Sequence, residues 1–551
     1  MAILITHGYL LTGTGSNLYV NNLVRELVKK GEDVVLVCQD FDPSAIDFVN
    51  EWFDFDECNS TAVLKSRKET AFPGRCWCYR PNLNRFLPVY VYDHYEGFEV
   101  KEFNNCSDAE VKRYVDQNVA AMSFILDKHE VEVVNTNHLV MFPYIAKLLK
   151  INFTFKFVIT VHGSALNFTV KKDKRFEQFA IESLKVADEI VVDSLHADEE
   201  LKEFLDEVGL GQFKQRIEII PAGVDVNSFG LPVKSKDLMI EDFKSAIKEA
   251  AQVSKGRSIA QNQAVKDYGF SLNEIEGKVE QLRQSYDYRG IDQGITSEID
   301  RLNIGQSDNV FFVGKYLWTK GIYLMLCAIP EILRKNPRTN FIIAGFGPFR
   351  EPAEVILNAL AEGKVEELKK LVASSKLFAL EGHGNDGGEL PLLGSILEAH
   401  GDQMKRDVDS IDFDIRERVL FTGILNHAQL VHLLPAMDVL IAPSVFPEAF
   451  GMVAIEAASC GVFPVVTYQS AFREIADHIK DLVGDLFETR DVTLDPAASI
   501  NIAYNVLAFI DHKKTWEADD LVTFKQSLRR LVVENFSWEG IAGKYLVNYR
   551  K

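Results

Sequence analysis

The sequence predicts a protein of the α/β class with two domains. Three observations support this prediction: the chain has 551 residues, short apolar runs alternate with helical patterns, and the alternation occurs in two separate blocks. A chain of this length rarely builds a single hydrophobic core. Apolar, β-branched runs between helices are typical of parallel strands covered on both faces. We therefore expect two Rossmann-like domains that face each other across a cleft.

The first block covers residues 1–225 and begins with a strand, a glycine-rich turn and a helix. We expect the helix over about 18–30, where Gly31 is a stop signal. Strands are expected at 2–6, 33–38, 131–135, 157–161 and 189–192. Residues 72–103 are rich in aromatic side chains, Arg and Pro. We expect a loop or hairpin there, either one that shapes an acceptor pocket or a purely structural excursion.

The second block covers residues 226–535 and repeats the alternation of strand and helix. Strands are expected at 310–314, 341–345, 419–423, 438–442 and 462–466. Two polar stretches, at about 231–308 and 351–415, have helical periodicity and lack the strand pattern. We expect both to be helical insertions in the second domain.

Composition and charge argue against several kinds of partner. The chain has 60 Lys and Arg against 80 Asp and Glu, a formal net charge of −20. Nucleic acid is a poor candidate, because phosphate backbones are bound by basic surfaces. No apolar run reaches the roughly 18 residues of a membrane-spanning helix, and the start lacks the basic segment of a signal peptide. Seven cysteines without regular spacing are typical of the reducing cytoplasm, where we expect the protein.

The most informative motif places two glutamates around the end of a predicted strand. Glu448 falls in the loop that follows the strand, and Glu456 lies about two turns into the next helix. In open α/β sheets, ligands bind at this carboxyl edge. Amides at a helix start suit a phosphate, and carboxylates accept hydrogen bonds from sugar hydroxyls. The motif therefore predicts a site for a nucleotide diphosphate sugar, with amides from Phe450, Gly451, Met452 and Val453.

Two motifs of the first block also lie at strand ends. Gly13 and Gly15 belong to a turn that lets the backbone approach a ligand closely, although a tight turn without a ligand fits equally well. The turn matches neither the P-loop nor the dinucleotide-binding fingerprint. His162 directly follows the strand at 157–161, where its imidazole is expected to face the ligand. A structural histidine is the alternative.

Two motifs of the second block are candidates for ligand contacts: one supplies cations, and the other lets a ligand come close to the backbone. Lys315 and Lys320 follow a strand and can neutralise a diphosphate that leaves, although a solvated loop is the alternative. Gly347 follows the next strand and would let a base or ribose come close to the backbone. We interpret residues 382–386 as a turn rather than a metal loop, and we expect no metal site.

Taken in order, these elements resemble the retaining glycosyltransferases of family 4, which have the GT-B fold. The segment from Glu448 to Glu456 is similar to the E-x7-E element of that family, and the segment from Lys315 to Lys320 is similar to its phosphate-binding stretch. Residues 536–545 look like its terminal helix, which returns to the first domain. Lys315 stands where arginine is usual, so a bidentate contact to phosphate is not expected there.

The resemblance implies a separate role for each of the two domains. Residues 1–225, together with a terminal helix at about 536–551, would form the acceptor domain. Residues 226–535 would bind the donor, a nucleotide sugar. Gly15 would approach the phosphates of the donor, and His162 would hydrogen-bond to its sugar and steady charge at the reacting centre.

For the donor domain, the resemblance implies a role for each charged residue. Glu448 and the neighbouring amides would hold the donor sugar and the distal phosphate. Glu456 would accept hydrogen bonds from the ribose. Lys315 and Lys320 would hold the diphosphate as it leaves, so that no divalent metal and no other cofactor is needed.

The implied function is transfer of a hexosyl group from a UDP- or GDP-sugar to a small-molecule or glycan hydroxyl, with retention at the anomeric carbon. Such an activity belongs to carbohydrate metabolism. Two alternatives stay open: a nucleotide-sugar epimerase of GT-B form, and a sugar-nucleotide-binding protein without catalysis. The sequence does not determine the base, the sugar, the acceptor or whether the chain forms a homo-oligomer.

Overall fold

A computed structural model describes residues 2–13, 15–90, 95–250, 256–266, 272–287, 289–378 and 390–551. The predicted turn at 382–386 lies outside these residues. The chain forms two compact units: unit 1 comprises Met1–Asp225 and Asn535–Lys551, and unit 2 comprises Val226–Glu534.

Unit 1 is built on a nine-stranded sheet, in which β3 and β4 form the one antiparallel pair among the described residues. The strands predicted from apolar runs are all present near the middle of this sheet. In sheet order, the strands are β11 (Ile217–Ile219), β10 (Glu189–Val192), β9 (Lys156–Val161), β8 (Val131–Asn137), β1 (Ala2–Thr6), β2 (Asp33–Val37), β5 (Cys76–Arg80), β3 (Glu51–Phe55) and β4 (Ala62–Arg67).

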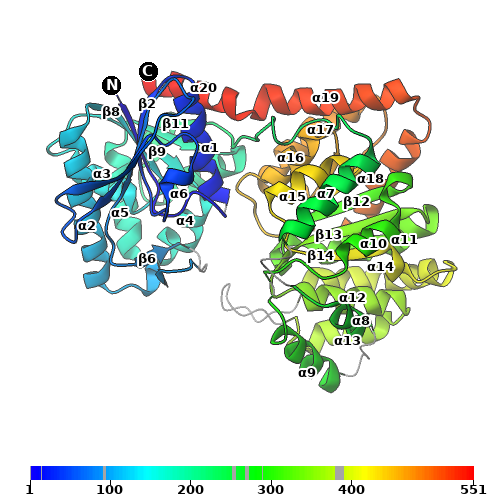
Figure 1. Cartoon of the computed structure of the whole chain (residues 1–551). Helices are drawn as coiled ribbons and strands as arrows, with labels where there is room; N and C mark the ends of the chain where they lie inside the picture. Colours follow the sequence, from blue (N-terminus) through cyan, green and yellow to red (C-terminus); the bar gives the residue numbers. More distant parts are fainter. Residues whose placement is uncertain are drawn as a thin grey trace. The chain divides into compact units, whose positions relative to one another are not determined.

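Helices cover both faces of the unit 1 sheet (Figure 1). The parallel strands near the middle of the sheet are buried on both sides, as the continuous apolar runs predict, whereas the edge strand β11 is partly exposed. One group consists of packed neighbours α2 (Asp108–Lys128), α3 (Phe142–Leu149) and α5 (Lys174–Val186). Another group consists of α1 (Gly15–Lys29) and α20 (Trp538–Arg550). The remaining helices are α4 (Gly163–Phe168) and α6 (Leu195–Glu207).

The prediction of a loop or hairpin at 72–103 is wrong. This stretch supplies β5, which lies in the main sheet between β2 and β3. It also supplies β6 (Phe86–Val89) and β7 (Glu99–Glu102), which pair with each other in parallel. The Arg and Pro residues indicated a loop, but Arg80 forms a paired contact with Asp54 and Tyr79 is fully buried.

The C-terminal helix α20 is an integral part of unit 1. The hydroxyl of Tyr545 lies 2.7 Å from that of Tyr19 on α1. The amide of Asn135 on β8 donates to the hydroxyl of Tyr549 at 2.6 Å. Because these contacts are buried, residues at the two ends of the chain share one core.

Unit 2 is built on a five-stranded sheet in which all the described strand pairs are parallel. Each strand was predicted from its apolar run. In sheet order, the strands are β14 (Val419–Gly423), β13 (Thr339–Phe346), β12 (Asp308–Lys315), β15 (Val439–Ala442) and β16 (Phe463–Val466).

Helices make up the rest of unit 2 (Figure 1). The polar stretch before β12 forms α7 (Lys236–Ala250), α8 (Ile259–Lys266), α9 (Leu272–Arg283) and α10 (Ile295–Leu302). The stretch after β13 forms α12 (Arg350–Ala361), α13 (Val365–Ser374) and α14 (Pro391–Asp409). The others are α11 (Ile322–Lys335), α15 (His427–Leu433), α16 (Met452–Ser459), α17 (Ser470–Val483), α18 (Ala498–Lys513) and α19 (Ala518–Phe536). None of the helices in the described residues is both long and apolar enough to cross a membrane.

Candidate active site

The predicted pair of glutamates lies on a loop and a helix that follow β15. Glu448 is in the loop, and Glu456 is in α16. Gly451 precedes α16 and has a left-handed backbone with φ of 88°. A Cβ atom at this position would lie 2.1 Å from the ring of Phe472 on α17, so the loop needs glycine here.

Glu448 and Lys320 form an ion pair across two neighbouring loops. The Nζ of Lys320 lies 2.5 Å from Oε1 of Glu448, and the hydroxyl of Ser444 donates to the same oxygen. The backbone N–H of Glu448 donates to Ser470 Oγ at 2.9 Å. Among the described residues, the side-chain contacts of Glu448 fall on Oε1, which leaves Oε2 available to accept a hydrogen bond.

The loops after β12 and β15 are held together by their backbones. The N–H of Val445 donates to the carbonyl of Thr319 at 2.8 Å. Gly321 has φ of +64°, and a Cβ there would lie 1.8 Å from the carbonyl oxygen of Pro443. This close contact brings Lys320 to Glu448. Lys315 lies at the end of β12, where its side chain is exposed.

Gly347 lies in the loop after β13 and faces the backbone of the next loop. A Cβ on Gly347 would lie 2.6 Å from the carbonyl oxygen of Tyr316, and its φ is +138°. The N–H of Phe349 donates to the same carbonyl at 2.9 Å. In this structure the glycine is therefore required by packing between the loops after β12 and β13.

Glu456 is nearly buried, and its described partner is a histidine that sequence reasoning missed. Nε2 of His427 lies 3.4 Å from Oε1 of Glu456, and the His427 side chain is half exposed. His427 begins α15, where Asn426 and Gln429 form a capping box. This Asn-x-x-Gln pattern after a strand could have placed His427 at the same sheet edge.

The amides expected to bind phosphate lie at the start of α16. Met452 and Val453 are its first two residues and are partly exposed, whereas Phe450 is buried. The first N–H groups of a helix have no partner within the helix and carry the positive end of its dipole. This edge therefore combines free amides, one lysine and two carboxylates.

In unit 1, His162 is buried at the end of β9. Its Nε2 lies 3.0 Å from Oδ1 of Asn137, and its ring meets that of Tyr19 edge-on. Gly13 has φ of +98°, and Gly15 is the first residue of α1. A Cβ on either glycine would meet nothing within 4 Å, so packing within the described residues does not demand glycine there.

Two further histidines, missed by sequence reasoning, lie beside His162. His7 follows β1 and His138 follows β8, and the ring centroid of His138 is 5.0 Å from that of His162. Burial, followed by the charge of His162, lowers the pKa of His138 well below its usual value. Burial lowers the pKa of His7 to about 4. Each histidine directly follows a strand, and that shared position is the signal that could have revealed the group.

Within the described residues, no group of three or more His, Cys, Asp or Glu side chains is arranged so that it could hold a metal ion. Cys76 and Cys78 are buried in β5, and the sulfur of Cys78 lies 3.5 Å from that of Cys38. Burial raises the pKa of Cys76 above its usual range. These thiols belong to the core of unit 1.

Comparison with known proteins identifies sequence relatives. The family described as Glycosyltransferase Family 4 matches residues 13–228, and the family described as Glycosyl transferases group 1 matches residues 403–493. An uncharacterized glycosyltransferase of Methanocaldococcus jannaschii is 24% identical over 46% of this chain and 47% of its own length. The phosphatidylinositol N-acetylglucosaminyltransferase gpi3 subunit of Schizosaccharomyces pombe is 22% identical over 42% and 36%. The chain thus spans less than half the length of these relatives.

Solved structures share the fold over the whole chain. Trehalose-6-phosphate synthase OtsA is similar with a TM-score of 0.52 at 8% identity, and HepE from Anabaena in complex with UDP is similar with a TM-score of 0.50 at 13% identity. Each comparison covers 100% of this chain and 99% of the solved chain. The Glycosyltransferase Family 4 match lies almost wholly in unit 1 and the group 1 match lies in unit 2, and the solved structures show that the chain has the GT-B fold.

Proposed function

We propose that the protein transfers a hexosyl group from a UDP- or GDP-sugar to a hydroxyl acceptor with retention of the anomeric configuration. The observation that carries this proposal is the Lys320–Glu448 pair beside the start of α16. The pair places a cation and an orientated carboxylate where free helix amides suit a phosphate. The UDP bound to Anabaena HepE supports a uridine donor.

In this proposal, the diphosphate lies at the start of α16. The amides of Met452 and Val453 donate to the distal phosphate, and Lys315 and Lys320 neutralise its charge. Lys320 and Ser444 hold Oε1 of Glu448, so that Oε2 accepts a hydrogen bond from a sugar hydroxyl. No divalent cation is needed, because lysines and a helix start supply the positive charge.

The chemical step then needs no nucleophile from the protein. The bond between the anomeric carbon and the phosphate oxygen breaks as the acceptor oxygen approaches on the same face. The departing phosphate oxygen takes the proton of the acceptor hydroxyl, which balances the charge. Stabilisation of that oxygen by Lys320 acts mainly in the transition state, so it raises the rate more than the binding of the donor.

Glu456 and His162 have supporting roles in the proposal. Glu456 accepts hydrogen bonds from the ribose, while His427 at 3.4 Å holds one of its oxygens. Nε2 of His162 lies 3.0 Å from Asn137 and Nδ1 lies 3.7 Å from Oδ2 of Asp193, so His162 donates to a hydroxyl of the donor sugar by exchanging one of these contacts. Gly15 leaves the start of α1 open to the phosphates, since a Cβ there would meet nothing within 4 Å.

The test is Glu448→Gln, with Glu366→Gln as the matched control. Glu366 lies on α13 in the same unit, and its side chain is largely exposed. If Glu448 holds the sugar, its replacement raises the Kd for UDP-glucose or GDP-mannose by roughly tenfold, which corresponds to one lost charge-assisted hydrogen bond. A covalent nucleophile would instead lose turnover at unchanged donor affinity, and that result would refute the role given to Glu448.

Product analysis separates the alternatives. Incubation with donor alone, followed by NMR of the sugar, detects an epimerase through an altered free sugar. Incubation with an acceptor panel detects transfer, and the anomeric coupling constant of the product shows whether the configuration is retained. Tight binding of the donor with no transfer or hydrolysis across the panel would leave a binding protein.

A further inference from the structure

Unit 2 contains a cavity of about 160 Å³ that lies apart from the residues of the candidate active site. It is formed by α8, α10, α12 and the edge strand β14. Its walls include the following side chains: Ile259, Asn262, Glu354, Leu357, Leu420 and Phe421.

The size and lining of the cavity define what it can hold. An engineered cavity of about 150 Å³ with apolar walls binds benzene, so this volume fits a single ring. Leu357 and Leu420 are buried and make an apolar wall. Three of the four charged residues in the lining are ion-paired: Arg416 with Asp414 at 2.7 Å, Glu298 with Arg301 at 2.8 Å and Glu354 with Arg257 at 2.7 Å. The fourth, Lys266, is exposed and so can stay in contact with solvent. The ligand expected here is therefore an uncharged, largely apolar ring with one polar group.

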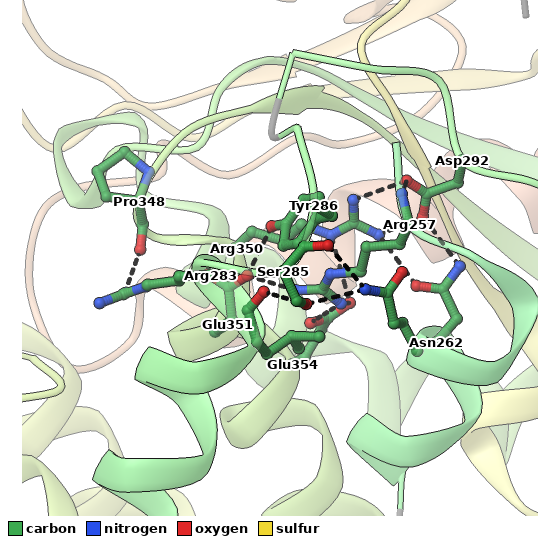
Figure 2. A network of polar contacts seen from close by, with 12 residues as sticks. Arg257, Asn262, Arg283, Ser285, Tyr286, Asp292, Pro348, Arg350, Glu351 and Glu354 are labelled. Carbon is green, nitrogen blue, oxygen red and sulfur yellow. Dashed lines mark hydrogen bonds and ion pairs between the residues drawn. The ribbon is translucent and has the colours of Figure 1, made fainter. Parts of the chain in front are cut away.

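The wall next to α8 is part of a buried ionic network (Figure 2). Arg257 is fully buried and donates to Glu354 at 2.7 Å and to Glu351 at 2.6 Å. Arg350 donates to Asp292 at 2.9 Å. Burial lowers the pKa of Arg257, but the charges of Glu354, Glu351 and Tyr286 together outweigh burial, and the net pKa is raised. The ion pairs of the network hold α12 to the segment before β12.

The network also contacts the loop that follows β13 and the carboxyl end of β14. Arg283 donates to the carbonyl of Pro348 at 2.5 Å, directly after Gly347 (Figure 2). The backbone N–H of Asp292 donates to the carbonyl of Thr422 at 3.0 Å. In open α/β sheets these carboxyl-end loops border the ligand. A change in the network therefore reaches the backbone of the proposed donor site.

The cavity and the network share two side chains. Asn262 lines the cavity, donates to Asp292 at 3.0 Å and accepts a hydrogen bond from Arg350 at 3.4 Å. Glu354 lines the cavity and pairs with Arg257. A ring packed in the cavity presses on residues that hold the network in place.

We propose that this cavity is an effector site for a small uncharged ring, and that its occupation tightens binding of the nucleotide donor. The second part rests on the proposed function. The ring fills the space between α8 and α12, which holds Asn262 and Glu354 in the arrangement that keeps Arg283 on the loop after β13. A ligand that favours one arrangement of a coupled element raises the affinity for a second ligand that favours the same arrangement.

The first experiment measures binding of 4-fluorophenol to the full chain by fluorine NMR. The probe is expected to broaden with the wild type. Ile259→Trp places an indole at the mouth of the cavity, where Ile259 is 65% exposed, and abolishes the broadening. Ile151→Trp is the matched control, because Ile151 is 77% exposed in unit 1. No broadening with the wild type, or equal broadening with Ile259→Trp, would overturn the site.

The second experiment measures the Kd for UDP by calorimetry with and without saturating 4-fluorophenol. The probe is expected to tighten UDP binding about fivefold in the wild type, at the low end of known couplings. Arg283→Met keeps the cavity but removes the contact to Pro348, so the probe still broadens while UDP affinity no longer responds. A wild type that binds the probe with unchanged UDP affinity would refute the effector role. A chain that binds the probe but no nucleotide would refute the proposed function instead.

Discussion

Replacement of Gly451 by alanine tests whether the loop before α16 positions the donor. Gly451 has φ of 88°, a left-handed conformation that an L-residue with a side chain adopts at a cost of about 1–2 kcal/mol. The new Cβ would lie 2.1 Å from the ring of Phe472, which is itself buried. Such a contact forces either the ring or the loop to move.

The backbone cost and the cost of the steric clash add to give the expected loss of stability. Overpacking in a core costs about 1–3 kcal/mol. Together with the backbone cost, Gly451→Ala is expected to lower the free energy of unfolding of unit 2 by about 2–5 kcal/mol. If the loop moves to relieve the clash, the amides of Met452 and Val453 leave their positions. The affinity for UDP then falls as well.

Urea unfolding and UDP binding measure both effects, and Gly394→Ala is the matched control. Gly394 lies within α14, and a Cβ there would meet nothing within 4 Å. Alanine in a helix is about 0.5–1 kcal/mol more stable than glycine, so the control is expected to stabilise the same unit. A Gly451→Ala protein with wild-type stability and wild-type UDP affinity would show that the loop does not depend on this glycine.

Two further predictions concern buried charges of unit 2. Burial alone raises the pKa of Asp438, but Lys236 and Lys513 at 2.8 and 2.9 Å lower it from 3.8 to about 2. This carboxylate therefore stabilises the fold by about 2.5 kcal/mol above pH 4, and the stability is lost as the pH falls from about 4 to 2. Urea unfolding should show the stability gap between wild type and Asp438→Asn shrinking over that range, and a constant gap would contradict the assignment. Arg257→Met removes the closest cation from two buried carboxylates, Glu351 and Glu354, which keep only longer contacts to Arg283 at 3.2 Å and Arg350 at 3.5 Å. The change is expected to lower the unfolding free energy by about 3 kcal/mol, whereas a change below about 1 kcal/mol would show that the network adds little.

The strands that consist of an unbroken run of buried apolar residues could be predicted from the sequence. Glu448 in its loop and Glu456 in its helix also follow from local patterns, since strand, glycine and helix signals lie within one short segment. The contact between Lys320 and Glu448 does not follow, because it depends on β12 lying next to β15 in the sheet. Strand order is a long-range property that periodicity does not encode.

The segment before β12 is helical, as predicted, but its polar sequence gave no sign of the buried ionic network, in which Arg257 and Asp292 are among the most buried residues of the segment. A charged residue is expected to be exposed unless the fold places an opposite charge beside it. Here α12 supplies the opposite charges. Residues 72–103 were misread for a similar reason, since Arg80 at the end of β5 is balanced by Asp54.

The place of α20 in unit 1 has a consequence for synthesis of the chain. Tyr19 is buried partly by Tyr545 and Trp538, which are translated only after the whole of residues 226–534. At roughly 5–20 residues per second, the first unit waits about 15–60 s for its last helix. During that time the groove that α20 fills stays open on the ribosome. Unit 2 is therefore translated in full before unit 1 receives its last helix.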